Sequence, residues 1–336
     1  MTLPISPPLA PMLSKSRDEL PRGEGWVYEP KWDGFRAIVF RDGEDVHIGS
    51  RTKRPLHRYF PELLDPLRKA LPERCVMDGE IVLAREGRLD FEALQLRLHP
   101  AESRVRMLSE AIPASFVGFD LPALGDEDLC ARPLSERWEL LAGILEERSI
   151  RDLLRDGPIV ARTPRTDDPE EAERWMDELG AFGLDGVIAK TGDLAYRPGE
   201  RTMVKVKKRR TADCVVGGYR IHKDGQGVGS LLLALYAEDG TLHHVGFTAS
   251  FRAKQRRELL DVVRPHHGES AFGEHAGPGG PSRWRQEETP WIPLRPELVC
   301  EVAFNHTTGR RIRHGATFVR WREDKDPRDC TMDQIA

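Results

Sequence analysis

The stretch EPKWDGFRAIVF, residues 29–40, joins a lysine to an apolar run. Phe35–Phe40 is rich in aromatic and β-branched residues, which predicts a strand. Asp33-Gly34 is a hairpin signal, so Lys31 and Arg36 flank a predicted turn. A lysine amine is normally protonated, but nearby cations, a metal ion or desolvation lower its pKa and make it a nucleophile. The alternative reading of Lys31 is a solvent-facing side chain beside the turn.

The chain has 336 residues, of which 39% are hydrophobic and 32% are charged. This length predicts two domains, and the composition allows a sizeable core. The formal net charge of −4 provides no strong overall field for a polyanion. A nucleic-acid surface would therefore have to come from local clusters of basic residues.

The five cysteines are odd in number, and none are spaced as C-x-x-C. This pattern argues against a disulfide framework and a zinc ribbon, and indicates reduced thiols in the cytoplasm. The N-terminal segment is interrupted by prolines and makes a poor signal peptide. No apolar run is long enough to span a membrane, so we expect a cytoplasmic protein with no membrane contact.

The first two-thirds of the chain mixes strand-like and helix-like runs. Predicted strands are Phe35–Phe40, Val46–Ile48, Cys75–Ala84, Ser115–Leu121 and Gly186–Lys190. Predicted helices are Tyr59–Ala70, Phe91–Leu98, Leu134–Glu147 and Pro169–Leu179. Strands joined by short turns, with helices between them, predict an α+β fold with largely antiparallel sheets.

After the basic run KVKKRR the sequence becomes strand-rich. Predicted strands are Cys214–His222, Ser230–Tyr236, Leu242–Thr248, Leu298–Phe304 and Ala316–Arg322, with one helix at Arg252–Val263. Five strands and a helix fit a small Greek-key barrel of the oligonucleotide-binding (OB) type. Residues 264–290 are rich in Gly, Pro and His and predict a long loop.

The opening stretch contains the pattern Lys-x-Asp-Gly-x-Arg at 31–36. Six further segments follow it in order: SRTKR (50–54), DGE (78–80), FVGFDLPAL (116–124), LDGVIAK (184–190), VKVK (204–207) and RWREDKDP (320–327). These seven segments resemble the motifs of covalent nucleotidyltransferases, the family of DNA ligases, RNA ligases and mRNA capping enzymes. Together with TADCVVGGYR at 211–220, they resemble bacterial ATP-dependent DNA ligases of the ligase C type and the ligase part of ligase D. The resemblance covers essentially the whole chain.

This resemblance implies a two-domain ligase core. Residues 1–207 would form the adenylation (nucleotidyltransferase) domain, and residues 208–336 the OB-fold domain. The reaction implied is sealing of nicks with 3′-hydroxyl and 5′-phosphate ends, through lysyl-AMP and DNA-adenylate.

Residue roles follow from the same resemblance, position by position. Lys31 would carry AMP, while Asp33 and Gly34 would set the turn and Asp33 would orient the nick. The implied nucleotide ligands are Glu29, Arg36, Arg51, Glu80, Phe119, Ile188, Lys190, Lys205 and Lys207. Glu29 would read the adenine amino group, Phe119 would stack on adenine, and Arg36 and Glu80 would contact the ribose.

The implied metal is Mg²⁺ or Mn²⁺, with Asp185 and Glu80 as its ligands. Asp185 stands where the family usually has Glu, so its side chain is shorter by one methylene. Lys205 and Lys207 are two residues apart and would share one face of a strand, which lets both reach one phosphate group.

The last motif, with Arg320, Arg322, Asp324 and Lys325, lies in the second domain and would orient the departing pyrophosphate. The barrel would then swing away to admit DNA. The expected DNA-facing residues are Arg209, Arg210, Arg220, Lys223, Arg310, Arg311 and Arg313, with Lys208 at the hinge. Contacts of this kind with phosphates are independent of sequence, as nick sealing requires.

Two alternatives stay open at the level of sequence. One is an RNA ligase or a capping-type guanylyltransferase, and the other is a non-catalytic nucleic-acid-binding protein. For a ligase C-type enzyme we expect a nucleoid-associated monomer that acts on nicked double-stranded DNA in repair. The Ku end-binding protein and repair polymerases are its candidate partners.

Overall fold

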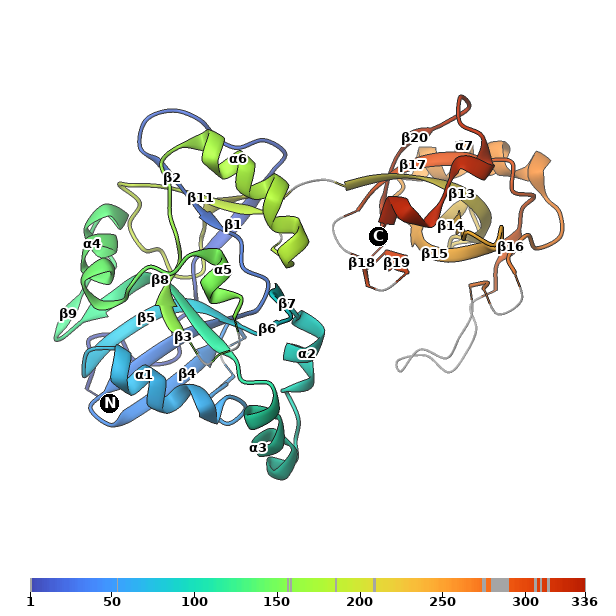
Figure 1. Cartoon of the computed structure of the whole chain (residues 1–336). Helices are drawn as coiled ribbons and strands as arrows, with labels where there is room; N and C mark the ends of the chain where they lie inside the picture. Colours follow the sequence, from blue (N-terminus) through green and yellow to red (C-terminus); the bar gives the residue numbers. More distant parts are fainter. Residues whose placement is uncertain are drawn as a thin grey trace. The chain divides into compact units, whose positions relative to one another are not determined.

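The computed structural model divides the chain into two compact units, Met1–Lys208 and Arg209–Ala336, each described here by itself (Figure 1). It describes residues 2–335 except 53, 156, 158, 185, 208–209, 274–275, 279–289, 305–306, 309 and 313–314.

The larger sheet of the first unit has strand order β10-β8-β5-β3-β4, with β9 beside β8. Its strands are β3 (Phe35–Asp42), β4 (Asp45–Ser50), β5 (Arg74–Val82), β8 (Ser115–Leu124), β9 (Glu127–Asp128) and β10 (Val160–Arg162). All pairs are antiparallel except β10 with β8. Gly43, at φ 62°, provides the left-handed conformation that the two-residue β3–β4 loop needs.

The second sheet of this unit has strand order β1-β12-β11-β2. Its strands are β1 (Leu13–Arg17), β2 (Trp26–Pro30), β11 (Val187–Thr191) and β12 (Arg201–Val206). The β1–β12 pair is parallel, and the other two pairs are antiparallel. The predicted α+β fold with largely antiparallel sheets is therefore confirmed.

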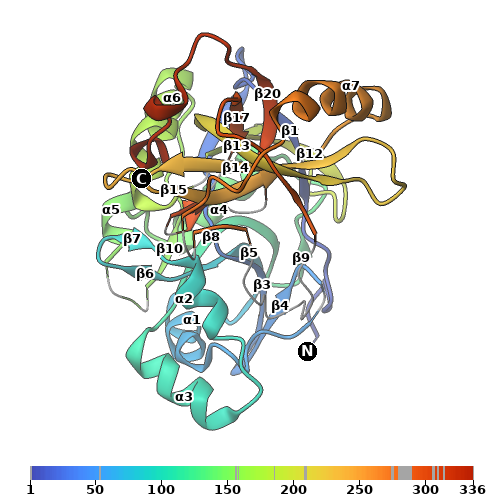
Figure 2. The ribbon, with the colours of Figure 1, turned by 90° about the vertical axis from the view of Figure 1, so that its right-hand side faces the viewer.

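Helices cover both sheets of the first unit. They are α1 (Leu64–Ala70), α2 (Phe91–Leu96), α3 (Glu102–Ala111), α4 (Leu134–Ile144), α5 (Ile150–Leu153) and α6 (Pro169–Glu178). In Figure 2, α1, α2 and α3 lie close together, and α4 packs against β8. Short 3₁₀ turns (Pro61–Leu63, Leu179–Phe182) and the hairpin β6 (Ala84–Arg85)–β7 (Arg88–Leu89) complete the unit. Helix α6 begins as its sequence predicts, with Asp168 accepting a hydrogen bond from the Glu170 N–H and Pro169 in the first turn.

The second unit is built on a sheet with strand order β15-β14-β13-β17-β20 and a short β16 beside β13. The strands are β13 (Arg210–Ile221), β14 (Val228–Tyr236), β15 (Leu242–Thr248), β16 (Ile292–Pro293), β17 (Val299–Phe304) and β20 (Thr317–Trp321). Helix α7 (Ala253–Val263), three 3₁₀ turns (Arg264–His266, Pro327–Asp329, Met332–Ile335) and the hairpin β18 (Thr307–Thr308)–β19 (Arg311–Ile312) accompany it. Both the five predicted strands and the predicted helix are present.

The two edges of this sheet meet at one parallel bridge, Thr248–Ala316, where the Ala316 N–H donates to the Phe247 carbonyl at 2.8 Å. Among the described residues this bridge is the sole pairing between the ends of β15 and β20, so the described part of the sheet is not a fully paired barrel. Within the described residues, no helix has the length and apolar character needed to cross a membrane.

Candidate active site

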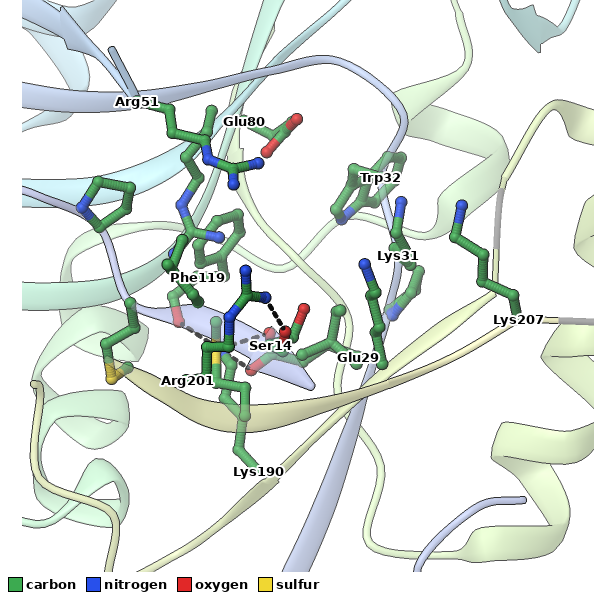
Figure 3. Close-up of a pocket in the computed structure, with 18 residues that line it drawn as sticks. Ser14, Glu29, Lys31, Trp32, Arg51, Glu80, Phe119, Lys190, Arg201 and Lys207 are labelled. Carbon is green, nitrogen blue, oxygen red and sulfur yellow. Dashed lines mark hydrogen bonds and ion pairs between the residues drawn. The ribbon is translucent and has the colours of Figure 1, made fainter. Parts of the chain in front are cut away.

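A cavity of about 280 Å³ lies between the two sheets of the first unit (Figure 3). Strands β1, β2, β11 and β12 provide residues on one side, and β3, β5 and β8 provide residues on the other. The cavity brings together the nucleotide ligands expected from the first unit's motifs: Glu29, Lys31, Arg36, Arg51, Glu80, Phe119, Ile188, Lys190, Lys205 and Lys207.

The segment Lys31–Gly34 crosses from one sheet to the other. Strand β2 ends at Pro30 in the smaller sheet, and β3 begins at Phe35 in the larger one. The prediction of a hairpin at Asp33-Gly34 is therefore wrong, because its two flanking strands do not pair with each other. Lys31 is tied to the smaller sheet by its N–H, which donates to the Gly186 carbonyl at 2.8 Å.

Glycine is required at position 34 because the backbone of β5 comes very close to it, and not because its φ angle is positive. A Cβ atom at this position would lie 2.1 Å from the carbonyl oxygen of Ile81 in β5. Such a distance is impossible for a real side chain, so Gly34 lets the crossing segment press against the larger sheet. This contact fixes the level at which β3 enters that sheet.

Strand register in the smaller sheet aligns three of the cavity residues. Glu29 in β2 pairs with Ile188 in β11, and Ile188 pairs with Lys205 in β12. Directly opposite residues of neighbouring strands project from the same face. In β12, Arg201, Met203 and Lys205 line the cavity while the alternating Val204 and Val206 pack in the core on the other face.

Glu29 and Lys190 form a buried ion pair at the wall of the cavity. The Lys190 Nζ atom lies 2.8 Å from Oε2 and 3.0 Å from Oε1 of Glu29, and the two residues are 1% and 2% exposed. Burial raises the pKa of Glu29, and the charge and hydrogen bonds of Lys190 oppose that rise. Lys190 also lies 5.1 Å from the centre of the Phe119 ring.

Arg36 is held by Asp78 from the same sheet. Its Nε and Nη2 donate to the two Asp78 oxygens at 2.6 and 2.7 Å, and the Tyr196 hydroxyl donates to Asp78 Oδ2 at 2.6 Å. The guanidinium carbon of Arg36 lies 4.3 Å from the centre of the Phe119 ring. Asp78 and Tyr196 therefore position two cavity residues, Arg36 directly and Phe119 through it.

Glu80 is a second carboxylate of the cavity, and its pKa is shifted toward neutral pH. It pairs with Arg36 across β5 and β3. Burial raises its pKa to about 7, although the charges of Arg36 and Lys31 act in the opposite direction. A carboxyl group that is neutral or charged near pH 7 can both donate and accept hydrogen bonds.

In the view of Figure 3, Lys31 and Lys207 lie at one end of the cavity and Phe119 lies toward the other. Lys205 lines the same cavity. These lysines provide positive charge where phosphates would be held. The aromatic ring and the Glu29–Lys190 pair provide a surface suited to a flat base with polar edges.

Other predicted site residues lie elsewhere. Asp33 is not among the described residues that line the cavity. Asp185 lies outside the described residues, as do Lys208, Arg209 and Arg313.

Arg322 and Lys325 belong to the second unit. Arg322 donates to Asp213 at 2.9 Å and to Asp324 at 2.8 and 2.9 Å. The hydrogen bonds from Arg322 lower the pKa of Asp324 to about 2.

Sequence reasoning missed several residues that build this site. Residues 11–14, Trp32, Arg201 and Met203 also line the cavity. Asp120 next to Phe119 is paired with Arg137 of α4 through bonds of 2.7 and 3.0 Å, with both side chains buried. A signal existed for Asp78, which is the first residue of the DGE segment, whereas nothing local marks Arg137 or Tyr196.

A lysine at the crossing between two sheets, inside a basic cavity with an aromatic wall, defines the nucleotidyltransferase class. Residues 7–207 match the family model described as the ATP dependent DNA ligase domain, and residues 224–325 match the ATP dependent DNA ligase C terminal region. The chain belongs to the ATP-dependent DNA ligases and is an enzyme of that activity.

Two mycobacterial proteins are similar over the whole chain. DNA ligase C2 of Mycolicibacterium smegmatis is 51% identical, and DNA ligase C of Mycobacterium tuberculosis is 49% identical; each match covers 100% of this chain and 96% of the relative. A solved structure from a study of Lig E DNA ligases has a TM-score of 0.54 at 16% identity, covering 93% of this chain and 99% of that chain, and so shows the fold. The ligase C resemblance is confirmed over the RNA-ligase, capping-enzyme and binding-protein alternatives.

Proposed function

We propose that Lys31 is the nucleophile that carries AMP and that this ligase seals nicks with 3′-hydroxyl and 5′-phosphate ends. The Nζ atom loses a proton and attacks the α-phosphorus of ATP, the bond from that phosphorus to the bridging oxygen breaks, and pyrophosphate leaves. AMP then passes to a 5′-phosphate, and the 3′-hydroxyl displaces it. The single observation behind the proposal is that Lys31 shares one cavity with the other expected nucleotide ligands.

The adenine end of the cavity is built by Glu29, Phe119, Ile188 and Lys190. We assign Glu29 as the acceptor for the adenine amino group and Phe119 as the stacking ring. An ionised carboxylate accepts hydrogen bonds only, which fits an amino group and not a carbonyl. Phe119 lines the cavity, as a stacking ring must, and is not confined to the hydrophobic core.

The ribose and phosphate end is assigned to the remaining cavity residues. Arg36 and Glu80 would contact the ribose, and Arg51 would bind the AMP phosphate or the 5′-phosphate of the nick. Lys205 and Lys207 would neutralise charge on the phosphates, which is the main protein contribution to phosphoryl transfer. Asp33 would orient the nick, with Gly34 setting its place.

A divalent metal, Mg²⁺ or Mn²⁺, is the proposed cofactor. No group of three or more His, Cys, Asp or Glu side chains among the described residues could hold a metal by itself. Mg²⁺, however, is commonly held by one or two carboxylates together with substrate phosphates, and Glu80 lines the cavity. We assign Glu80 and Asp185 as its ligands, where the metal would neutralise phosphate charge.

The second domain has two proposed roles, one in adenylation of the lysine and one in binding DNA. We take residues 1–207 as the adenylation domain and 208–336 as the OB-fold domain. Arg322 and Lys325 would orient the departing pyrophosphate, and the domain would then move so that DNA can enter. The DNA surface would include Arg210, Arg220, Lys223, Arg310 and Arg311.

Repair is the proposed setting. A protein named multifunctional non-homologous end joining protein LigD, from Pseudomonas aeruginosa, is 32% identical over 98% of this chain and 37% of its own length. We extend that setting to this chain, with nicked double-stranded DNA as substrate, Ku and repair polymerases as candidate partners, and a nucleoid-associated, cytoplasmic monomer as its form.

Labelling with α-labelled ATP tests the nucleophile. The protein is first stripped of bound AMP with pyrophosphate and then incubated with the nucleotide and Mg²⁺ or Mn²⁺, beside Lys31→Ala. Lys69→Ala is the matched control, because Lys69 is an exposed lysine at the end of α1. We expect an acid-labile adduct on wild type and the control but not on Lys31→Ala.

The adduct is then chased with nicked DNA. Discharge of AMP with formation of sealed product supports the whole proposal. An adduct that nicked DNA cannot discharge would overturn the substrate, and an adduct that persists on Lys31→Ala would overturn the nucleophile. A chelator added before ATP should abolish the adduct, and its persistence would contradict the metal assignment.

A further inference from the structure

Arg165 is a charged residue that no part of the proposed mechanism uses. It lies between β10 and α6, in a segment fixed at both ends by hydrogen bonds. The Thr163 N–H donates to the Gly118 carbonyl of β8 at 3.0 Å, and Thr166 exchanges backbone hydrogen bonds of 2.8 and 3.0 Å with Tyr28 of β2. The segment therefore runs beside Tyr28 and Gly118, which are one and two residues from Glu29 and Asp120.

The surroundings of Arg165 are energetically unfavourable for a positively charged side chain. Its Nη1 atom is buried and has no hydrogen-bond acceptor among the described residues. Its guanidinium carbon lies 4.6 Å from the centre of the Trp138 ring, while that of Arg162, a like charge, lies 4.7 Å from the same ring. A buried donor without an acceptor is unfavourable, so another interaction must offset this cost.

Glu29 provides the main offset. Burial lowers the pKa of Arg165, and the strongest opposing influence is the charge of Glu29. The influence is mutual, since Lys190 and then Arg165 lower the pKa of Glu29 against its burial. Asp120 contributes less to Arg165, and its two oxygens already accept bonds from Arg137. Arg165 is thus a second cation that acts on Glu29, in addition to Lys190.

We propose that Arg165 is a positioning residue for adenine recognition, which keeps Glu29 an ionised acceptor from a place outside the cavity lining. The inference rests on the proposed role of Glu29. Lys190 lines the cavity and is close enough to be drawn toward a bound nucleotide. Arg165 is not among the described lining residues, so its field on Glu29 persists when Lys190 is shared with the base.

Arg165 and Arg162 both lie over the ring of Trp138, so their substitutions form a matched pair of variants. Arg165→Met removes the charge that acts on Glu29, and Arg162→Met removes a charge at nearly the same distance from Trp138. Arg162 instead pairs with Glu147 at 3.0 Å. A loss caused by weaker packing on Trp138 would appear in both variants, whereas loss of the field on Glu29 would appear only in Arg165→Met. Arg165→Lys restores the charge and should restore the function.

The experiment measures KM and the maximal rate of enzyme adenylation with ATP and with inosine triphosphate. Inosine has a carbonyl where adenine has the amino group, so it gains nothing from an ionised Glu29. We expect Arg165→Met to raise KM for ATP by about tenfold, the effect of weakening one charge-assisted hydrogen bond. The maximal rate should change little, KM for inosine triphosphate should not rise, and Arg162→Met should match wild type.

Three results would overturn the inference alone, given a wild-type adduct: an unchanged KM for ATP in Arg165→Met, an equal rise in Arg162→Met, or a parallel rise for inosine triphosphate. Failure of Arg165→Lys to recover the KM for ATP would also count against it. Absence of any adduct on wild type would instead overturn the proposed function, and the inference with it.

Discussion

Arg137 and Asp120 form a buried, doubly hydrogen-bonded pair: the side chains are 0% and 1% exposed, and their bonds measure 2.7 and 3.0 Å. Arg137 also donates to the Leu194 carbonyl at 3.0 Å. The pair links α4 to β8 at the residue that follows Phe119. It therefore fixes the strand that carries an aromatic wall of the cavity.

Removing one partner of this pair should be strongly destabilising. Arg137→Met leaves the Asp120 carboxylate buried without its cation, and we expect a loss of about 3–5 kcal/mol in the free energy of unfolding. Urea denaturation measures it. Arg106→Met is the control, since Arg106 pairs with Glu102 at 3.1 Å on the exposed face of α3 and should cost about 0.5 kcal/mol or less. Similar losses in the two variants would contradict the prediction.

Glu80 should make the stability depend on pH. Its pKa is about 7 in the folded protein against an ordinary 4.5, so between these values the folded state binds more protons than the unfolded state. Stability therefore falls as pH rises through this window. Relative to wild type, Glu80→Gln should gain about 1–3 kcal/mol between the two ends of the window, because the glutamine does not titrate. Denaturation at several pH values checks this, and parallel curves would refute it.

Gly34→Ala should disrupt the crossing between the sheets. The added methyl would meet the Ile81 carbonyl at 2.1 Å, so either β3 or β5 must shift. We expect a loss of about 2 kcal/mol or more, and a sharp fall in adenylation at Lys31.

Gly143→Ala in α4 is the control for that substitution. A Cβ atom at position 143 has no neighbour within 4 Å, and alanine favours a helix, so this variant should be neutral or gain up to about 1 kcal/mol. Thermal unfolding and adduct formation are measured on both. Normal adduct formation by Gly34→Ala would count against the assigned role of the contact.

Tyr196→Phe removes the hydrogen bond from Tyr196 to Asp78, the carboxylate that holds Arg36. Burial, followed by the charge of Asp78, raises the pKa of Tyr196, so its hydroxyl remains a donor to that carboxylate. Loss of this hydrogen bond to a charged group should cost about 1.5–3 kcal/mol of stability. Because Tyr196 is not among the described residues lining the cavity, adenylation at saturating ATP should persist. A variant that is fully stable would show the bond to be weak.

The sequence predicted the long apolar strands well, because β3, β5 and β8 are continuous runs of core residues. It missed β1 (LSKSR), which is mostly polar and lies at the sheet edge, and α3, which has no side-chain cap at its start. The hairpin error at Asp33-Gly34 has a related cause. A turn signal is local and carries no information on which sheet each flanking strand joins.

The motifs of the first unit predicted which residues share the cavity, with the exception of Asp33, while their chemical roles stay proposals. The residues that hold these cavity residues in place could not be predicted from the sequence. Tyr196 lies 118 residues from Asp78, and Arg137 lies 17 residues from Asp120, so only the folded chain makes them neighbours. Arg165 likewise acquires its relation to Glu29 through the bridge between Thr166 and Tyr28.

The crossing segment has a mechanical consequence. Lys31 is anchored to Gly186 on one sheet, and three residues later Gly34 is pressed against Ile81 on the other. A change in the separation or tilt of the two sheets would therefore also move the backbone that carries Lys31. The width of the cavity and the position of this lysine are thus coupled, so opening the cavity would shift Lys31 relative to the residues on both walls.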